Sequence, residues 1–183
     1  MSRILVLYAS IDGQTARVAR HLASSLGRMG HAVTVRPSDA VEVVWEIGTH
    51  DAVIVGGAVR FGRVLKPLEA TVRERLVEIQ ARPNAFFSVC LSAGGPGARP
   101  ENARKYMQDF FDRTEWYPEL NASFAGALLY TRYNPLIRFL MRMILAMAGG
   151  DTDTSRDYEY TDWAAVERFA QQFAGRLRLA RAA

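Results

Sequence analysis

The sequence predicts a doubly wound α/β fold built on a five-stranded parallel sheet. Short, continuous apolar runs rich in Val, Ile and Leu alternate with segments whose apolar residues recur every three or four positions. Continuous apolar runs are typical of parallel strands covered on both faces, and the longer spacing is typical of amphipathic helices. Their alternation along 183 residues predicts right-handed crossovers around one sheet.

Each expected element follows from one of these two patterns. The apolar runs predict strands at residues 4–8, 32–35, 52–55, 85–91 and 124–129. The helical spacing covers residues 18–29, 67–79, 103–110 and 166–177, with a short helix expected at 40–45. Pro67 begins the second of these helices, because proline is favoured at the first helical position.

Composition restricts the classes of function. The chain is 49% apolar and 23% charged, which predicts one globular domain over residues 1–183 and excludes a disordered or disulfide-rich protein. The single cysteine, Cys90, is expected to be an inert residue of a buried strand. The net charge of +4 comes without a basic run, which argues against nucleic acid, and no His or Cys spacing predicts a metal.

The loop after the first strand carries the clearest binding motif, Ser10-Ile-Asp-Gly-Gln-Thr15. Ligands of doubly wound sheets bind beyond the carboxyl ends of the strands, where this loop lies. Two hydroxyls, a glycine and the free amides of a helix start predict a phosphate site. The alternative is that Ser10 or Asp12 only caps the helix. No glycine pattern typical of NAD-binding proteins or P-loop NTPases occurs.

Two further glycine-rich loops follow the third and fourth strands. Residues 55–63 contain three glycines and one aromatic residue, Phe61, and residues 92–97 contain three more glycines. Small residues let a flat ring lie against the backbone, with Phe61 available to pack beside it. The alternative is that both segments are simple turns.

These loops and the five-strand plan resemble the flavodoxin-like proteins, which bind FMN. The segment Ala148-Gly-Gly-Asp-Thr-Asp-Thr154, followed by Tyr160-Thr-Asp-Trp163, resembles the bacterial flavodoxin-type, quinone-dependent protoporphyrinogen IX dehydrogenase (oxidase) family. Flavodoxins generally have threonine at the position of Asp12, whereas the dehydrogenase branch has aspartate. We expect Asp12 to point away from the phosphate and to cap backbone amides.

The resemblance implies a flavodoxin-like fold with a helical insert after or within the fifth strand, and it implies a role for each loop. The implied phosphate residues are Ser10, Asp12, Gly13, Gln14 and Thr15. The implied neighbours of the isoalloxazine ring are Ala58, Val59, Arg60, Phe61, Gly62, Ser92, Ala93 and Gly94. Arg60 either contacts the ring or substrate or is a solvated loop charge, and no catalytic acid or base is assigned.

The insert at about 130–150 differs from the rest of the chain in being apolar and basic. Residues 134–148 predict an apolar helix of roughly 22 Å, too short to span a bilayer, with Arg138 and Arg142 on one face. Residues 120–150 contain three arginines and no acidic residue, and five acidic residues follow in 151–162. Such a helix suits peripheral contact with an anionic membrane, where a quinone is dissolved. The alternatives are an additional core helix or a subunit interface in a homo-oligomer.

The resemblance implies an oxidoreductase of heme biosynthesis at the inner face of the cell membrane, in the cytoplasm. It would oxidise protoporphyrinogen IX to protoporphyrin IX through FMN, with menaquinone or ubiquinone as electron acceptor. Because porphyrinogens carry propionates, arginines are expected to anchor them. The candidates are Arg60, Arg63, Arg132 and Arg138. The alternatives are a flavodoxin-like electron carrier, an NAD(P)H:quinone reductase or a flavin-free scaffold.

Overall fold

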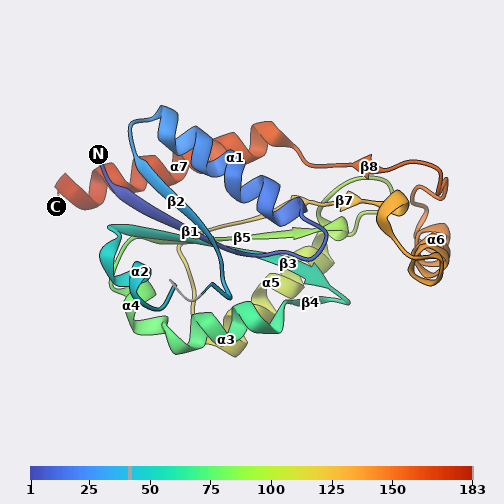
Figure 1. The fold of residues 1–183 in the computed structure, drawn as a ribbon, viewed down its shortest axis with the longest axis horizontal. Coiled ribbons are helices and arrows are strands. Elements are labelled where there is room, and N and C mark those ends of the chain that lie inside the picture. The colour runs from blue at the N-terminus through green and yellow to red at the C-terminus, as the bar shows by residue number, and fades with distance from the viewer. Residues whose placement is uncertain (41–42, 183) are drawn as a thin grey trace.

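A computed structural model describes residues 1–40 and 43–182 and has the predicted parallel sheet at its centre (Figure 1). The strand order is β2-β1-β3-β5-β6, and every neighbouring pair in that order is parallel. Their bounds are β1 Arg3–Ala9, β2 Ala32–Pro37, β3 Ala52–Arg60, β5 Asn84–Cys90 and β6 Leu120–Ala125. The order reverses between β1 and β3, which is where doubly wound sheets bind ligands.

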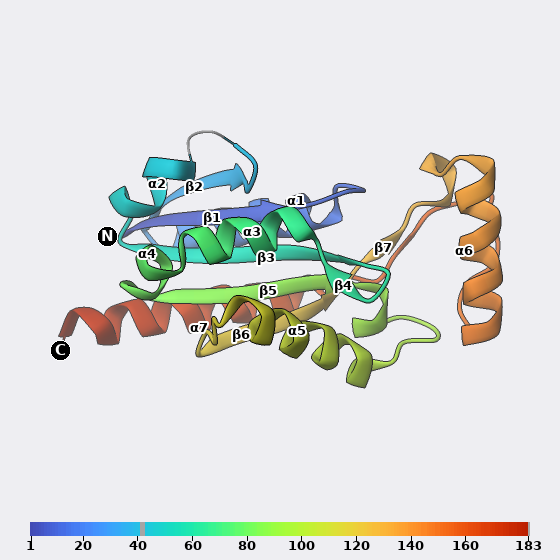
Figure 2. The same cartoon turned by 90° about the horizontal axis from the view of Figure 1, so that it is seen from below.

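Helices cover both faces of the sheet (Figure 2). One face packs against α1 (Gln14–Arg28) and α7 (Trp163–Ala182). The other packs against α2 (Val43–Thr49), α3 (Lys66–Glu74), α4 (Leu76–Gln80) and α5 (Pro100–Thr114). Successive residues of β1 alternate between the two cores, so Ile4 and Val6 join one and Leu5 and Leu7 the other. Burial on both sides explains the continuous apolar runs.

Two helical predictions need correction. The helix expected over 67–79 is divided between α3 and α4 at Arg75, whose φ of −113° and ψ of 19° lie outside the helical region. Leu68 and Val72 before the break and Ile79 after it are buried in the same core. The side-chain spacing therefore continues through the break. The short helix expected at 40–45 lies partly on residues 41–42, outside the described residues, and the observed helix α2 begins at Val43.

The fifth strand also differs from its prediction. It begins four residues before the expected 124 and ends before Gly126, where the chain leaves the main sheet. Residues Ala127–Leu128 form β7, which pairs antiparallel with β8, Tyr158–Glu159. The apolar run of 124–129 therefore belongs to two different sheets.

The segment 130–150 projects beyond the carboxyl ends of the strands (Figure 2). It contains a 3-10 turn, η2 (Tyr130–Arg132), and the predicted helix, α6 (Pro135–Ala148). Asn134 caps α6 by accepting a hydrogen bond from the Ile137 amide at 2.9 Å. No residue of α6 is buried, so α6 is not a core helix.

Candidate functional site

The first loop leads directly from β1 into α1. Gly13 is the N-terminal cap residue with a φ of 90°, which favours glycine. The Ser10 hydroxyl accepts a hydrogen bond from the Gly13 amide at 3.1 Å. Asp12 is exposed, and within the described residues it accepts no hydrogen bond from a backbone amide, so the expected capping by Asp12 is not seen; Ser10 takes that position instead.

The start of α1 has the properties of an anion site. A helix leaves the amides of its first turn without intrahelical acceptors, and its dipole is positive there. The first turn of α1 contains no acidic residue, and no side chain competes for these amides. The Ser10 and Thr15 side chains add hydroxyl groups next to them. The start of α1 can therefore accept a phosphate group.

Gln14 has a different role from the one expected of its side chain. Its amide group is turned inward and donates to Glu159 Oε1 at 3.0 Å and to Thr161 Oγ1 at 2.8 Å. Arg17 completes the arrangement by donating to Gln14 Oε1 and Glu159 Oε2. Only the backbone of Gln14 is therefore available to a phosphate, and the side chain fastens the first loop to β8.

The second segment is a hairpin. Ala58, Val59 and Arg60 continue β3, and they pair with the short strand β4, Arg63–Val64. Phe61 and Gly62 form the two-residue turn with φ values of 49° and 74°. Positive φ at both turn residues matches the twist of a tight hairpin. Phe61 is 80% exposed at its tip, with the Arg60 guanidinium 5.3 Å from the ring centre.

The third segment is the turn after β5. Residues Leu91–Ala93 form a 3-10 turn, η1, followed by Gly94, and these residues are half-buried beside the end of β6. Cys90, the last residue of β5, is 6% exposed, and burial raises the pKa of its thiol. The structure therefore confirms Cys90 as a residue of a buried strand.

The four candidate arginines are used differently. Arg63 donates two hydrogen bonds to Glu69, and Arg138 donates to the carbonyls of Tyr130 and Tyr133 at 2.9 and 3.2 Å. Both arginines therefore hold other parts of the protein. Arg60 and Arg132 are exposed, and neither forms an ion pair within the described ranges. Of the four, Arg60 and Arg132 are therefore the two whose guanidinium groups are not committed to an ion pair or to backbone carbonyls within the described residues.

Sequence reasoning missed a cluster of tyrosines at the base of the insert. The Tyr130 hydroxyl donates to the Asp151 carbonyl at 2.8 Å, and the Tyr160 hydroxyl donates to the Asp151 carboxylate. Tyr158 stacks on Tyr160 with ring centres 6.2 Å apart. Burial, together with the Asp151 carboxylate, raises the pKa of Tyr160. The available signal was the concentration of four of the seven tyrosines between residues 130 and 160.

The insert is packed directly against the flavin-loop candidates. A Cβ on Gly95, whose φ is 91°, would lie 2.7 Å from the Tyr160 ring, and one on Gly97 would lie 2.5 Å from the Ala148 carbonyl. On the other side, burial and the Asp12 carboxylate raise the pKa of Tyr133. The base and C-terminal end of the insert therefore adjoin the first and third loops.

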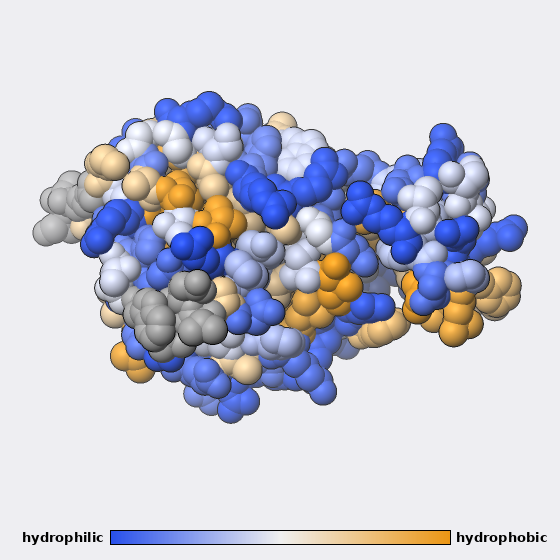
Figure 3. All heavy atoms as spheres, viewed as in Figure 1, coloured by the Kyte–Doolittle hydropathy of each residue, from blue (hydrophilic) through white to orange (hydrophobic). Residues whose placement is uncertain are grey.

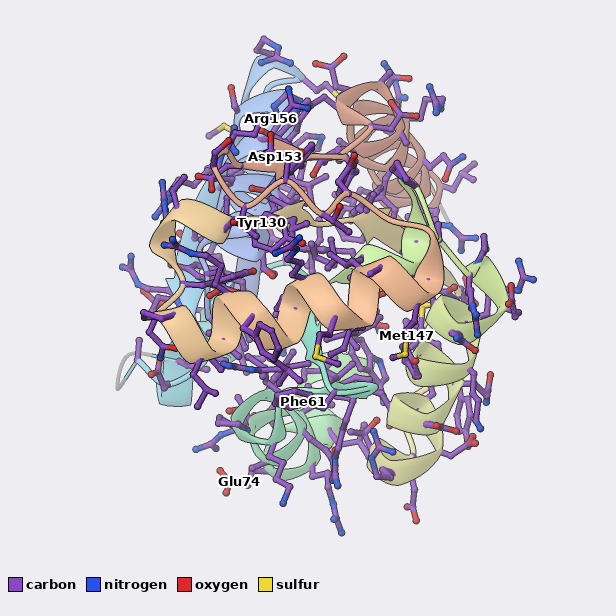
Figure 4. The ribbon with its side chains drawn as sticks, turned by 90° about the vertical axis from the view of Figure 1, so that its right-hand side faces the viewer. Phe61, Glu74, Tyr130, Met147, Asp153 and Arg156 are labelled. Atoms are coloured by element: carbon purple, nitrogen blue, oxygen red, sulfur yellow. The ribbon has the colours of Figure 1, made fainter. Side chains whose placement is uncertain are left out.

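The rest of α6 is exposed and apolar. Six of its large apolar side chains are exposed, from 40% at Ile144 to 80% at Met147, whereas Ile137, Met141 and Leu145 are half-buried. Figure 4 shows α6 across this end of the molecule, with Phe61 and Met147 on one side of the helix and Tyr130 on the other. Figure 3 shows apolar side chains gathered at the same end.

The surrounding structure limits the chemistry that this site can perform. Over residues 1–40 and 43–182, no group of three or more His, Cys, Asp or Glu side chains could hold a metal ion. None of the helices in these ranges combines the length and apolar character needed to cross a bilayer. One cavity, beside α1 and of about 470 Å³, is lined by Arg17, Arg20, His21 and Trp163. The candidate site is instead an open edge with a phosphate cradle, a glycine-rich hairpin and a turn.

The strand order and these three loops define a flavodoxin-like fold. A model of the flavodoxin domain matches residues 5–155. Among solved structures, flavodoxin 1 from Bacillus cereus is 14% identical with a TM-score of 0.58, over 95% of this chain and 98% of that chain. A flavodoxin from the domain Archaea is 17% identical with a TM-score of 0.55, over 96% and 99% of the two chains. These likenesses confirm the predicted fold.

Two curated relatives match nearly the whole chain. The protoporphyrinogen IX dehydrogenase (quinone) of Escherichia coli strain K12 is 35% identical over 173 residues, 94% of each chain. The protein of the same name from Leishmania major is 34% identical over 176 residues, 94% of this chain and 74% of that one. The chain therefore belongs to the flavodoxin-type, quinone-dependent protoporphyrinogen IX dehydrogenase family, as its sequence motifs predicted.

Proposed function

We propose that this protein binds FMN and oxidises protoporphyrinogen IX to protoporphyrin IX, with menaquinone or ubiquinone as acceptor, in heme biosynthesis. The relatives that carry this name match 94% of this chain. The observation that carries the proposal is the exposed, apolar helix α6 next to a phosphate and ring site. An electron carrier that docks to proteins needs no such helix, whereas an enzyme with two apolar reactants does.

The loops have distinct tasks in this proposal. The first-turn amides of α1, with the Ser10 and Thr15 hydroxyls, hold the phosphate. The hairpin residues Ala58–Gly62 border one side of the ring, and Ser92–Gly94 flank the other. FMN, when bound, supplies the two-electron chemistry. Arg60 and Arg132 attract the propionates of the substrate, because both side chains are exposed, Arg60 in the hairpin and Arg132 in the insert.

Helix α6 provides the contact with the lipid that contains the quinone. Six of its large apolar side chains are exposed, and residues 120–150 carry three positive charges and no negative ones. This combination favours a helix lying in the interface of an anionic membrane, as on the inner face of the cell membrane. The proposed location is therefore peripheral.

The deciding experiment is anaerobic. Protoporphyrinogen IX and menaquinone or ubiquinone are added to FMN-loaded protein, and porphyrin fluorescence is followed with and without quinone. An increase in porphyrin fluorescence that requires quinone supports the proposed activity. Arg60→Glu and Arg132→Glu should raise the KM for the porphyrinogen, while Arg178→Glu, an exposed control near the end of α7, should not.

Two outcomes contradict the proposal. Bound FMN that other donors reduce, without porphyrin formation, indicates an electron carrier or an NAD(P)H:quinone reductase. A colourless protein that does not bind added FMN indicates a scaffold that kept only the fold.

A further inference from the structure

Glu69 is a nearly buried carboxylate that belongs to none of the three loops. It lies on α3, and its side chain is 9% exposed. Arg63 of β4 donates to both of its oxygens at 2.9 and 3.0 Å, and Arg113 of α5 donates to Oε2 at 3.0 Å. One carboxylate therefore joins three separate elements through three charge-assisted hydrogen bonds.

The strand that Glu69 holds is the returning half of the hairpin. Arg63 pairs directly with Arg60 across the two strands, and Phe61 and Gly62 form the turn between them. Arg63 is thus one residue away from the turn. Both hydrogen bonds come from one nitrogen, Nη2 of Arg63, which lies within 3.0 Å of both carboxylate oxygens and so ties β4 to α3.

The other contacts of the hairpin fix its base more firmly than its tip, because Val64 of β4 is fully buried in the core. The Leu65 amide donates to the Ala58 carbonyl at 3.2 Å, which closes the base of the hairpin. Near the tip, Tyr106 of α5 lies beside Gly62, where an added Cβ would be 3.2 Å from the ring. Phe61 itself is 80% exposed, so the Phe61 side chain has little packing to fix its position.

We infer that Glu69 is a positioning residue for FMN, which acts through Arg63 by fixing the hairpin that borders the flavin ring. This inference rests on the proposed function, since it requires FMN to bind at the hairpin. The same pairing neutralises Arg63, so that Arg60 is the hairpin arginine left for the ring or substrate.

The role of Arg113 separates positioning from stability. Both arginines pair with the same carboxylate, but Arg113 comes from α5, and Arg63 from the hairpin. Loss of either arginine weakens the charge cluster. Only loss of Arg63 frees the hairpin, so Arg113→Met is the matched control for Arg63→Met.

The test compares FMN binding by wild type, Glu69→Gln, Arg63→Met, Arg113→Met and the double variant Glu69→Gln/Arg63→Met. Titration of flavin fluorescence gives the dissociation constant of FMN, and the visible circular dichroism of saturated protein reports how rigidly the ring is held. Thermal unfolding measures stability separately. If Glu69→Gln does not fold, Arg63→Met makes the same test at a side chain that is 40% exposed.

We expect Glu69→Gln and Arg63→Met each to raise the dissociation constant of FMN by roughly tenfold or more, as loss of charge-assisted hydrogen bonds predicts. Both should lose visible circular dichroism at saturation. The double variant should bind no more weakly than either single variant, because both changes break one interaction. Arg113→Met should lower the melting temperature with little change in FMN binding.

If Arg113→Met weakens FMN binding as much as Arg63→Met does, the inference is overturned, because the loss of binding would then follow the loss of stability alone. If Glu69→Gln binds FMN as tightly as the wild type does, the inference is overturned as well, but the proposed function is not affected. If the wild type itself binds no FMN, the proposed function and this inference fail together.

Discussion

The exposed ring of Phe139 on α6 allows a quantitative test of membrane contact. Phe139 is 60% exposed. For a phenylalanine with a surface of about 200 Å², this corresponds to about 120 Å² of apolar area. At about 25 cal/mol per Å², full coverage by lipid would contribute about 3 kcal/mol. A helix lying in the interface covers roughly half of this area, so Phe139→Ser should weaken binding about tenfold.

The assay is co-sedimentation with vesicles of phosphatidylglycerol and phosphatidylcholine at low salt. Val77→Ser is the control, because Val77 is 81% exposed on α4, at the opposite end of the molecule from α6 (Figure 2). Unchanged sedimentation of Phe139→Ser, or an equal loss in Val77→Ser, would refute the reasoning. A dimer of the wild type that Phe139→Ser dissociates would assign the face of α6 to a second copy of the chain.

Three further predictions concern the packed interior. Gly56→Ala should destabilise the protein by about 1–3 kcal/mol or more in denaturant unfolding, because the added Cβ would lie 2.0 Å from the Phe87 ring. Gln14→Ala and Thr161→Val should each cost about 1–2 kcal/mol, and additive losses in the double variant would show that the two side chains do not interact. Burial alone would raise the pKa of Glu69, but its two arginine partners lower it below 4.5. The stabilisation that ionised Glu69 gives the folded protein is complete above pH 4.5 and is lost as the pH falls through the lowered pKa. The melting temperatures of wild type and Glu69→Gln should therefore converge in acid.

The site was only partly predictable, because some of its features depend on neighbouring residues in the chain and others depend on contacts between distant elements. The position of Gly13 at the start of α1 could be predicted, because a glycine after a buried strand and before a helix is a local feature. The ion pair of Arg63 could not be predicted, because its partner Glu69 lies on another element. Glu69 also binds Arg113, which is 44 residues further along the chain than Glu69. An arginine that binds substrate and one that binds a buried carboxylate look the same in a sequence.

The sequence by itself determined the layers, the parallel sheet and the three loops at its edge. Apolar runs, helical spacing and glycines report interactions between residues near each other in the chain, so they can be recognised without coordinates. Only the tertiary structure decided that the Gln14 side chain donates to Glu159 of β8, and that Asp151 joins Tyr130 to Tyr160. These pairings depend on elements that meet only after the sheet has formed.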